Sequence, residues 1–273
     1  MGRTRIGWLC LIASVAALMV GVPGASAAEY EVRGLPELGR CVQAAPGTGV
    51  YPSNTCITAG SPGTGSFEWI QVTAEEKRTF SGSGLESILT TVGHTTIRCT
   101  SASLSGEYTG PKNATVHIAF HGCTNSAGAQ CQSEPTNKGE ISTLPLEGEL
   151  GFIKNQVKEG KTIIAVGFDL APQTPFSDLI IFECGGVAES VRVDGSVIGR
   201  IKPLDKMTTV SNFIYKVTKT GKQAVEKFEG DPKDTLTTTF TSGIESSSGA
   251  STLTIKSETG HYSTPLEIKA KGN

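Results

Sequence analysis

From residue 67 onward the chain is a succession of short segments rich in Val, Ile, Thr and Phe, separated by clusters of Gly, Pro, Ser and Asn. This composition is typical of β-strands joined by turns. In one segment Val116, Ile118 and Phe120 share a face, a pattern that favours antiparallel sheets with one buried side. Strands are predicted at residues 67–72, 85–92, 95–99, 114–121, 162–170, 179–184, 189–201, 208–217, 224–228, 235–241, 251–256 and 266–268.

Helix signals are scarce. The segment from Thr73 to Glu76 resembles a capping box, but no apolar stripe at helical spacing follows it. Without helices between the strands, parallel crossover folds are disfavoured. The sequence therefore predicts an all-β fold, either an antiparallel sandwich or a partly closed barrel of many short strands.

The N-terminus predicts export. Arg3 and Arg5 precede an apolar run over residues 6–22, and a small-x-small cleavage pattern ends at Ala27. Cleavage after Ala28 fits almost as well. The run is too short to favour a permanent membrane span, and no later segment approaches spanning length. We expect a secreted protein, extracellular or associated with the cell surface, with residues 1–27 as its signal peptide.

The charge balance disfavours two classes of partner. The chain has 24 basic and 26 acidic side chains, and removal of Arg3 and Arg5 changes its formal charge from −2 to −4. Nucleic acids need concentrated positive charge to displace their counterions. An electrostatic membrane anchor also needs a basic cluster. We therefore expect no nucleic-acid partner, and an envelope component or another extracellular ligand instead.

The cysteines predict a disulfide framework. Cys10 leaves with the signal peptide, and an even number in an exported chain indicates disulfides. Spacing favours Cys41 with Cys56 and Cys123 with Cys131, each closing a short polar loop, although sequence leaves the connectivity open. Cys99 and Cys184, which end two similar strands, would then form the third pair.

The chain divides by composition. Residues 28–66 are rich in Gly and Pro, and we expect an irregular, disulfide-closed lid. Residues 67–204 form the predicted main β domain. Residues 205–273 lack cysteine and resemble consecutive hairpins packed on the same domain.

The segment around His117, His121 and Cys123 is the most suggestive of metal binding. On a strand the two histidines share a face but lie about 13 Å apart, too far to hold one ion. Cys123 is also expected to be oxidised. We predict no metal site and no cofactor.

Catalytic patterns are weak. The chain has no Gly-x-Ser-x-Gly elbow, and His94 and His261 lie in predicted turns. Glu140, Glu147 and Glu149 could supply a carboxylate pair, but alternating Glu on a solvated face explains them equally well. We therefore predict no catalytic residue.

Aromatic residues give no evident sugar-binding platform. Phe67 and Trp69 share a strand face, and Trp69 is the tryptophan that remains after cleavage. Packing in the core is the simpler prediction for both side chains.

Several short motifs occur along the mature chain: residues 35–41 (Leu-Pro-Glu-Leu-Gly-Arg-Cys), Tyr51, Cys56, residues 67–69 (Phe-Glu-Trp), the loop 121–131, residues 139–151 and the ending at 266–268. Together they resemble motifs of a group of exported, β-rich proteins of high-GC Gram-positive bacteria. The resemblance implies export and assigns no activity or functional residue.

The sequence does not establish an activity. We expect a non-enzymatic binding or surface-associated structural protein that acts outside the membrane. An extracellular hydrolase, with a site assembled from distant strands, is the alternative and predicts a deep pocket with converging titratable groups. A component of an envelope layer would instead expose an apolar patch.

The export and disulfide predictions are tested together by intact mass. Protein recovered from culture medium is expected to begin at Ala28 or Glu29, and its thiols are expected to react with an alkylating reagent only after reduction. Alkylation without reduction would contradict the disulfide framework and would restore Cys123 as a candidate ligand or nucleophile.

Overall fold

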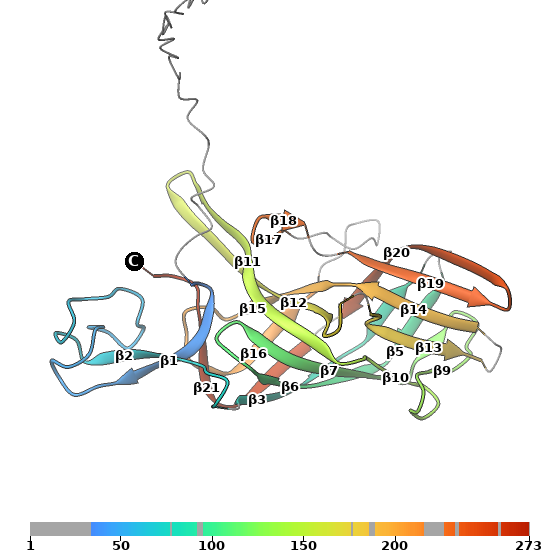
Figure 1. The fold of residues 1–273 in the computed structure, drawn as a ribbon, viewed down its shortest axis with the longest axis horizontal. Coiled ribbons are helices and arrows are strands. Elements are labelled where there is room, and N and C mark those ends of the chain that lie inside the picture. The colour runs from blue at the N-terminus through green and yellow to red at the C-terminus, as the bar shows by residue number, and fades with distance from the viewer. Residues whose placement is uncertain are drawn as a thin grey trace, which may run out of the picture.

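A computed structural model describes residues 34–76, 78–91, 95–175, 177–185, 189–215, 227–232, 235–255 and 258–272. Within these ranges the chain forms β-strands joined by turns and no helix, which confirms the all-β prediction (Figure 1). The same ranges accordingly hold no helix long and apolar enough to cross a membrane. The predicted signal peptide and His94 lie outside the described residues.

The larger sheet closes on itself. Its 11 strands in the described chain include β10 (Glu140–Ser142), β1 (Glu37–Gln43) and β2 (Phe67–Gln71), which lie outside the ring. The other eight pair in the order β16-β15-β12-β11-β7-β6-β3-β21, and β16 pairs again with β21. These are β3 (Arg78–Gly84), β6 (Ser101–Tyr108), β7 (Asn113–His121), β11 (Leu146–Lys158), β12 (Lys161–Pro172), β15 (Val197–Lys202), β16 (Thr208–Ile214) and β21 (Glu258–Lys269).

The second sheet has the order β8-β5-β4-β20-β19-β14-β13-β9. A β-bridge between Thr124 and Gln130 brings its two end strands together, so this sheet is also barrel-like. Its members are β4 (Ser87–Thr90), β5 (Thr96–Cys99), β8 (Thr124–Asn125), β9 (Cys131–Gln132), β13 (Ile180–Cys184), β14 (Glu189–Gly195), β19 (Leu236–Ser242) and β20 (Glu245–Ile255). A separate pair, β17 (Lys227–Phe228) and β18 (Asp231–Pro232), covers part of β11.

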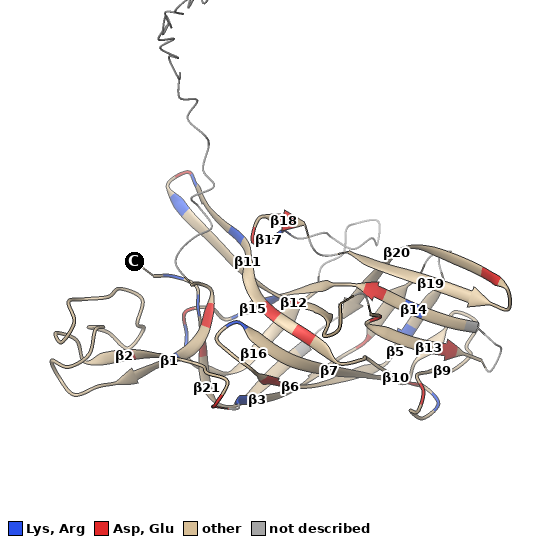
Figure 2. Cartoon of the chain, in the orientation of Figure 1, with Lys and Arg blue, Asp and Glu red and all other residues tan. Residues whose placement is uncertain are grey.

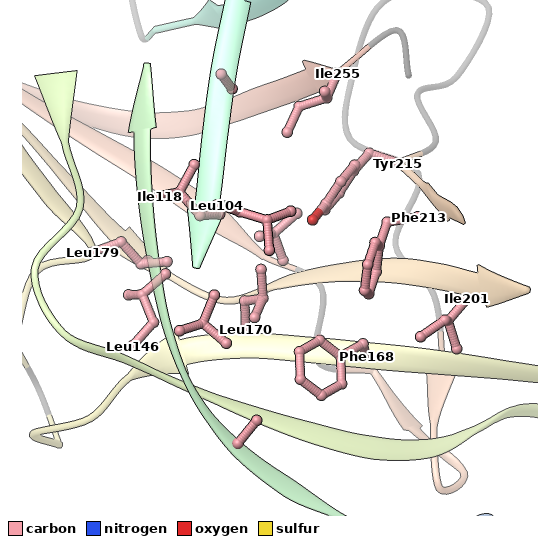
Figure 3. Packing of buried hydrophobic residues seen from close by; sticks show 14 of the residues in the cluster. Leu104, Ile118, Leu146, Phe168, Leu170, Leu179, Ile201, Phe213, Tyr215 and Ile255 are labelled. Atoms are coloured by element: carbon pink, nitrogen blue, oxygen red, sulfur yellow. The ribbon is translucent and has the colours of Figure 1, made fainter. Parts of the chain in front are cut away.

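The two sheets share one core because consecutive strands pass from one sheet to the other. Strand β5 continues into β6 after Thr100, and β14 continues into β15 after Ser196. Buried residues of both sheets form a single cluster, part of which Figure 3 shows around Leu104, Ile118 and Phe168. In the described chain, side chains fill both interiors and leave cavities of about 40, 20 and 10 Å³.

The predicted alternation is confirmed. Val116, Ile118 and Phe120 of β7 are buried, and His117 between them is exposed. Hydrophobic transfer of such side chains, at about 1.5–3 kcal/mol each, stabilises the fold.

The disulfides are Cys41–Cys56, Cys99–Cys123 and Cys131–Cys184 among the described cysteines. The first pairing is confirmed. The predicted pairs Cys123–Cys131 and Cys99–Cys184 are wrong because neighbouring strands, rather than short loops, bring the sulfurs together. Cys184 lies directly opposite Cys131 between β13 and β9. The pairing of β5 with β8 likewise continues to Cys99 and Cys123, whose Cα atoms are 4.0 Å apart.

The predicted lid is less irregular than expected. Strand β1 lies within it and pairs with β2 and with the C-terminal strand β21. The C-terminal region likewise contributes strands to both sheets. Three of the short sequence motifs, at residues 35–41, 67–69 and 266–268, therefore lie on or next to three paired strands, with β1 between β2 and β21.

A cluster of buried charged side chains and half-buried aromatic rings, which we call the clasp, joins these strands. It consists of Glu37, Tyr51, Trp69, Glu267 and Lys269. Lys269 lies opposite Glu37 and donates a hydrogen bond to Tyr51 Oη at 3.0 Å. Its ammonium also lies 4.5 Å from the Tyr51 ring centroid and 4.9 Å from that of Trp69, so both rings stabilise the cation.

The prediction that Trp69 packs in the hydrophobic core is therefore wrong. Its half-buried ring lies on Lys269 and against Gly39, where a Cβ atom would be 2.5 Å from Trp69 Cζ2. Glycine at this position lets the indole approach the strand.

Glu267 is the member of the clasp whose burial is poorly compensated by hydrogen bonds. Its side chain is buried, and Oε1 has no hydrogen-bond partner among the described residues. Burial is the main cause that raises the pKa of Glu267 from 4.5 to about 7. The charge of Asp205 raises it further, while Lys269 lowers it.

Glu267 should make the protein less stable at neutral pH than in mildly acidic solution. A folded pKa above the unfolded one means that the folded state binds the proton more tightly, so stability is lost as pH rises from about 4.5 through about 7. A rise in pKa from 4.5 to about 7 corresponds to a loss of about 3 kcal/mol in the free energy of unfolding. We expect E267Q to remove this loss, measured by urea unfolding between about pH 5 and pH 8 with disulfides intact. An unchanged pH profile in E267Q would show that Glu267 does not titrate in this range.

Candidate binding groove

A large hollow among the described residues lies where the two sheets meet. We call it the junction groove; its volume is about 640 Å³. It is lined by His117 of β7, residues 132–136, residues 142–145, residues 181–183 of β13 and Ser190 of β14. These segments are distant in sequence, and β10 brings them together because it pairs with β7 while the adjacent Thr143 forms a bridge to Ile180.

One wall, residues 132–136, is held by buried Ser133. Its hydroxyl donates to the carbonyl of Ile181 at 2.8 Å and accepts from the backbone N–H of Ser142 at 3.2 Å. Thr136 Oγ1 in turn donates to the Ser133 carbonyl at 2.6 Å. Ser133 therefore ties this wall to both β13 and β10.

The other wall is equally fixed. Thr143 is buried, its N–H donates to the Ile118 carbonyl at 2.9 Å, and its Oγ1 accepts from the Ile118 N–H at 3.0 Å. Leu144 N–H donates to the Leu179 carbonyl at 2.8 Å. A groove with such walls is preformed, so a ligand would bind with little loss of protein entropy.

The groove exposes aliphatic surface. Ile181 is 39% exposed and Leu144 is 38% exposed, whereas Phe182 points to the core and is 3% exposed. Hydroxyl and amide side chains, including Ser142, Ser190 and Gln132, surround this surface. A mixture of apolar area and a few polar groups is typical of small ligand sites.

A smaller hollow of about 240 Å³ adjoins the groove. Both are lined by Gln132 and Glu183, and Gln132 Nε2 donates to Glu183 Oε1 at 3.3 Å. This hydrogen-bonded pair forms a partition, and Lys138 lies beyond it in the smaller hollow.

Three ionisable side chains, Asp178, Arg192 and Asp194, lie beside the groove and form what we call the charged trio. Arg192 is directly opposite Ile181, on the same outward face. Its guanidinium donates to Asp178, with Nη2 2.6 Å from Oδ2 and Nε 3.1 Å from each carboxylate oxygen.

The carboxyl groups of Asp178 and Asp194 in this trio have opposite shifts. Burial raises the pKa of Asp178, but hydrogen bonds from Arg192 and Asp194 outweigh it and the net pKa is lowered. Burial and the neighbouring Asp178 raise the pKa of Asp194.

The candidate metal ligands are not brought together. His117 lines the groove, whereas His121 Nε2 lies 3.0 Å from Ser103 Oγ. Cys123 is bonded to Cys99, so its sulfur is not a free thiolate.

The candidate catalytic residues are also dispersed. Glu147 and Glu149 share the outward face of β11, where Asn113 Nδ2 donates to Glu147 at 3.3 Å. Glu140 pairs at the other end of β7, roughly 20 Å away by strand rise.

The predicted turn at His261 is wrong. His261 is an exposed residue within β21 and pairs with Ser81 and Val210. At the adjacent Gly260, a Cβ atom would lie 3.1 Å from Cε2 of the Phe213 ring. This glycine therefore lets the ring pack closely on the strand and does not indicate a turn.

Sequence reasoning missed Ser133, Thr143, Asp178 and Arg192, which shape the groove and its margin. Their contacts join segments that are far apart in the sequence, so no short sequence motif indicates them. One signal existed: alternation in β13 places Ile181 and Glu183 on the outward face.

No protein-family model, curated protein or solved structure matches this chain.

The coupling within the trio can be tested by D178N. Removing the negative charge of Asp178 removes an interaction that raises the pKa of Asp194, while Arg192 remains to lower it. The pKa of Asp194 is expected to fall, as measured by NMR titration of side-chain carboxyl carbons. An unchanged pKa of Asp194 would show that the two carboxyls are not coupled, and a raised one would contradict the expected direction of the coupling.

Proposed function

We propose that this chain is an exported, non-enzymatic binding protein and that the junction groove is its binding site. The observation that carries the proposal is a preformed hollow of about 640 Å³ that leaves Ile181 and Leu144 partly exposed among hydroxyl groups. Both barrel interiors are filled, so the outer groove is the larger space open to a ligand. Disulfides between neighbouring strands suit a protein that works outside the cell.

The arrangement of the lining supports a ligand held within the groove itself. The Gln132–Glu183 partition separates the groove from the smaller hollow. The other exposed large apolar residues of the described chain are spread over several places: Ile70 on β2, Leu85 and Ile244 in connections between strands, Val157 and Ile163 on the β11–β12 hairpin, and Ile214 on β16. Ile181 and Leu144, in contrast, line the same groove. This distribution favours a groove ligand over an apolar layer contact.

An extracellular hydrolase is the second candidate, and the Asp178–Asp194 pair favours it. Two neighbouring carboxyls with opposite pKa shifts can divide the roles of acid and base. Arg192, however, engages both oxygens of Asp178, which supports a structural ion pair.

Filling the groove provides the test. Ser190 faces it from β14, so S190W should block ligand access, while S246W on the exposed hairpin of β19 and β20 is the matched control. We expect fluorescent protein to bind members of immobilised peptide and oligosaccharide panels, and S190W to lose that binding at least about tenfold, a change of about 1.4 kcal/mol. S246W should bind as the unmodified protein does.

Two results would overturn the proposal. Equal binding by S190W and the unmodified protein would place the site elsewhere, and absence of binding to both panels would remove the evidence for a binding module. Bound ligand should also be recovered intact by mass spectrometry. Cleavage that is lost in D178N and D194N would establish the hydrolase instead.

A further inference from the structure

The junction groove has an acidic lining. Glu134 and Glu183 line it, and the described lining contains neither Lys nor Arg. Lys138 lies beyond the Gln132–Glu183 partition, and the guanidinium of Arg192 is engaged by Asp178. Basic positions are prominent elsewhere, as on the projecting β11–β12 hairpin (Figure 2). The groove is therefore complementary to a positively charged group.

The apolar part of the groove suits an aliphatic side chain. Ile181 and Leu144 offer branched aliphatic surface, and Pro145 adds to it. The phenyl ring of Phe182 is buried, so in the described lining it offers no face on which a sugar ring could stack. These features favour a peptide over a glycan.

The polar groups of the lining can satisfy a peptide backbone. Ser142 and Ser190 each carry a hydroxyl that donates and accepts, and Gln132 carries an amide. An extended backbone presents N–H and C=O groups that need partners of this kind when water is displaced.

We infer that the junction groove binds an extended peptide segment in which a Lys or Arg neighbours an aliphatic side chain. The aliphatic side chain packs on Ile181 and Leu144, and the cation lies near Glu183 and Glu134. The inference rests on the proposed function, since it names the ligand of the same groove.

Defined peptides test it. The probe is a fluorescein-labelled peptide of sequence Gly-Ser-Leu-Lys-Leu-Ser-Gly, compared with versions carrying Gln or Glu in place of Lys. Fluorescence anisotropy is expected to give at least about tenfold tighter binding for the Lys peptide than for the Gln peptide, and weaker binding still for the Glu peptide. The affinity of the protein for the Lys peptide should fall as the salt concentration rises, because salt screens the charges.

Protein variants locate the charge effect. The double variant E134Q/E183Q should bind the Lys peptide about tenfold more weakly than the unmodified protein does. The difference in affinity between the Lys and Gln peptides should also be smaller for this variant. E245Q, which removes an exposed carboxylate on the hairpin of β19 and β20, is the matched control and should bind unchanged. I181S should weaken the Lys and Gln peptides alike, because it removes apolar contact without altering charge.

The outcomes separate the inference from the proposed function. Equal binding of Lys, Gln and Glu peptides, or failure of all three, overturns the inference. Oligosaccharide binding that S190W abolishes would also overturn it while leaving the groove as the binding site. Peptide binding that S190W leaves unchanged would contradict both.

Discussion

The architecture depends on the pairing of the last strand. β21 pairs with β16 and β3 and so closes the larger sheet, and its C-terminal end pairs with β1. Closure removes the edges of that ring, which would otherwise expose unpaired backbone groups. The same strand carries Glu267 and Lys269 into the clasp, so the pairing that seals the ring also attaches the N-terminal segment. A buried lysine between two rings and a destabilised carboxyl are the local consequences.

Much of the fold was predictable because apolar alternation determines which face of a strand is buried. Segments with strong β-propensity, such as residues 114–121 and 180–184, were recognised. Strands β3 and β6 were missed because their sequences are rich in Ser and Gly, whose intrinsic propensity for strands is low. These two segments become strands because pairing within the closed ring gives them hydrogen bonds and burial. Their own sequences do not indicate this pairing.

The site was less predictable than the fold. Disulfide pairing followed strand register, which sequence spacing does not reveal: Cys131 is eight positions from Cys123 yet bonds to Cys184. The groove has the same origin, since β10 pairs with the ring while its neighbour Thr143 contacts the second sheet. His117 was recognised as an outward residue, but its neighbours in the groove come from other strands. Contacts of this kind follow from topology rather than from motifs.

The position of β21 also determines when the structure can form. Residues 37–39 pair with residues 267–269, so the first and the last described strands are partners. While the chain is being synthesised, β1 has no opportunity to make this pairing until residues 267–269 have been added. Loops that span most of a chain are entropically costly to close and slow folding. Until β21 has been made, the larger ring lacks its closing strand, so the facing edges of β3 and β16 stay unpaired.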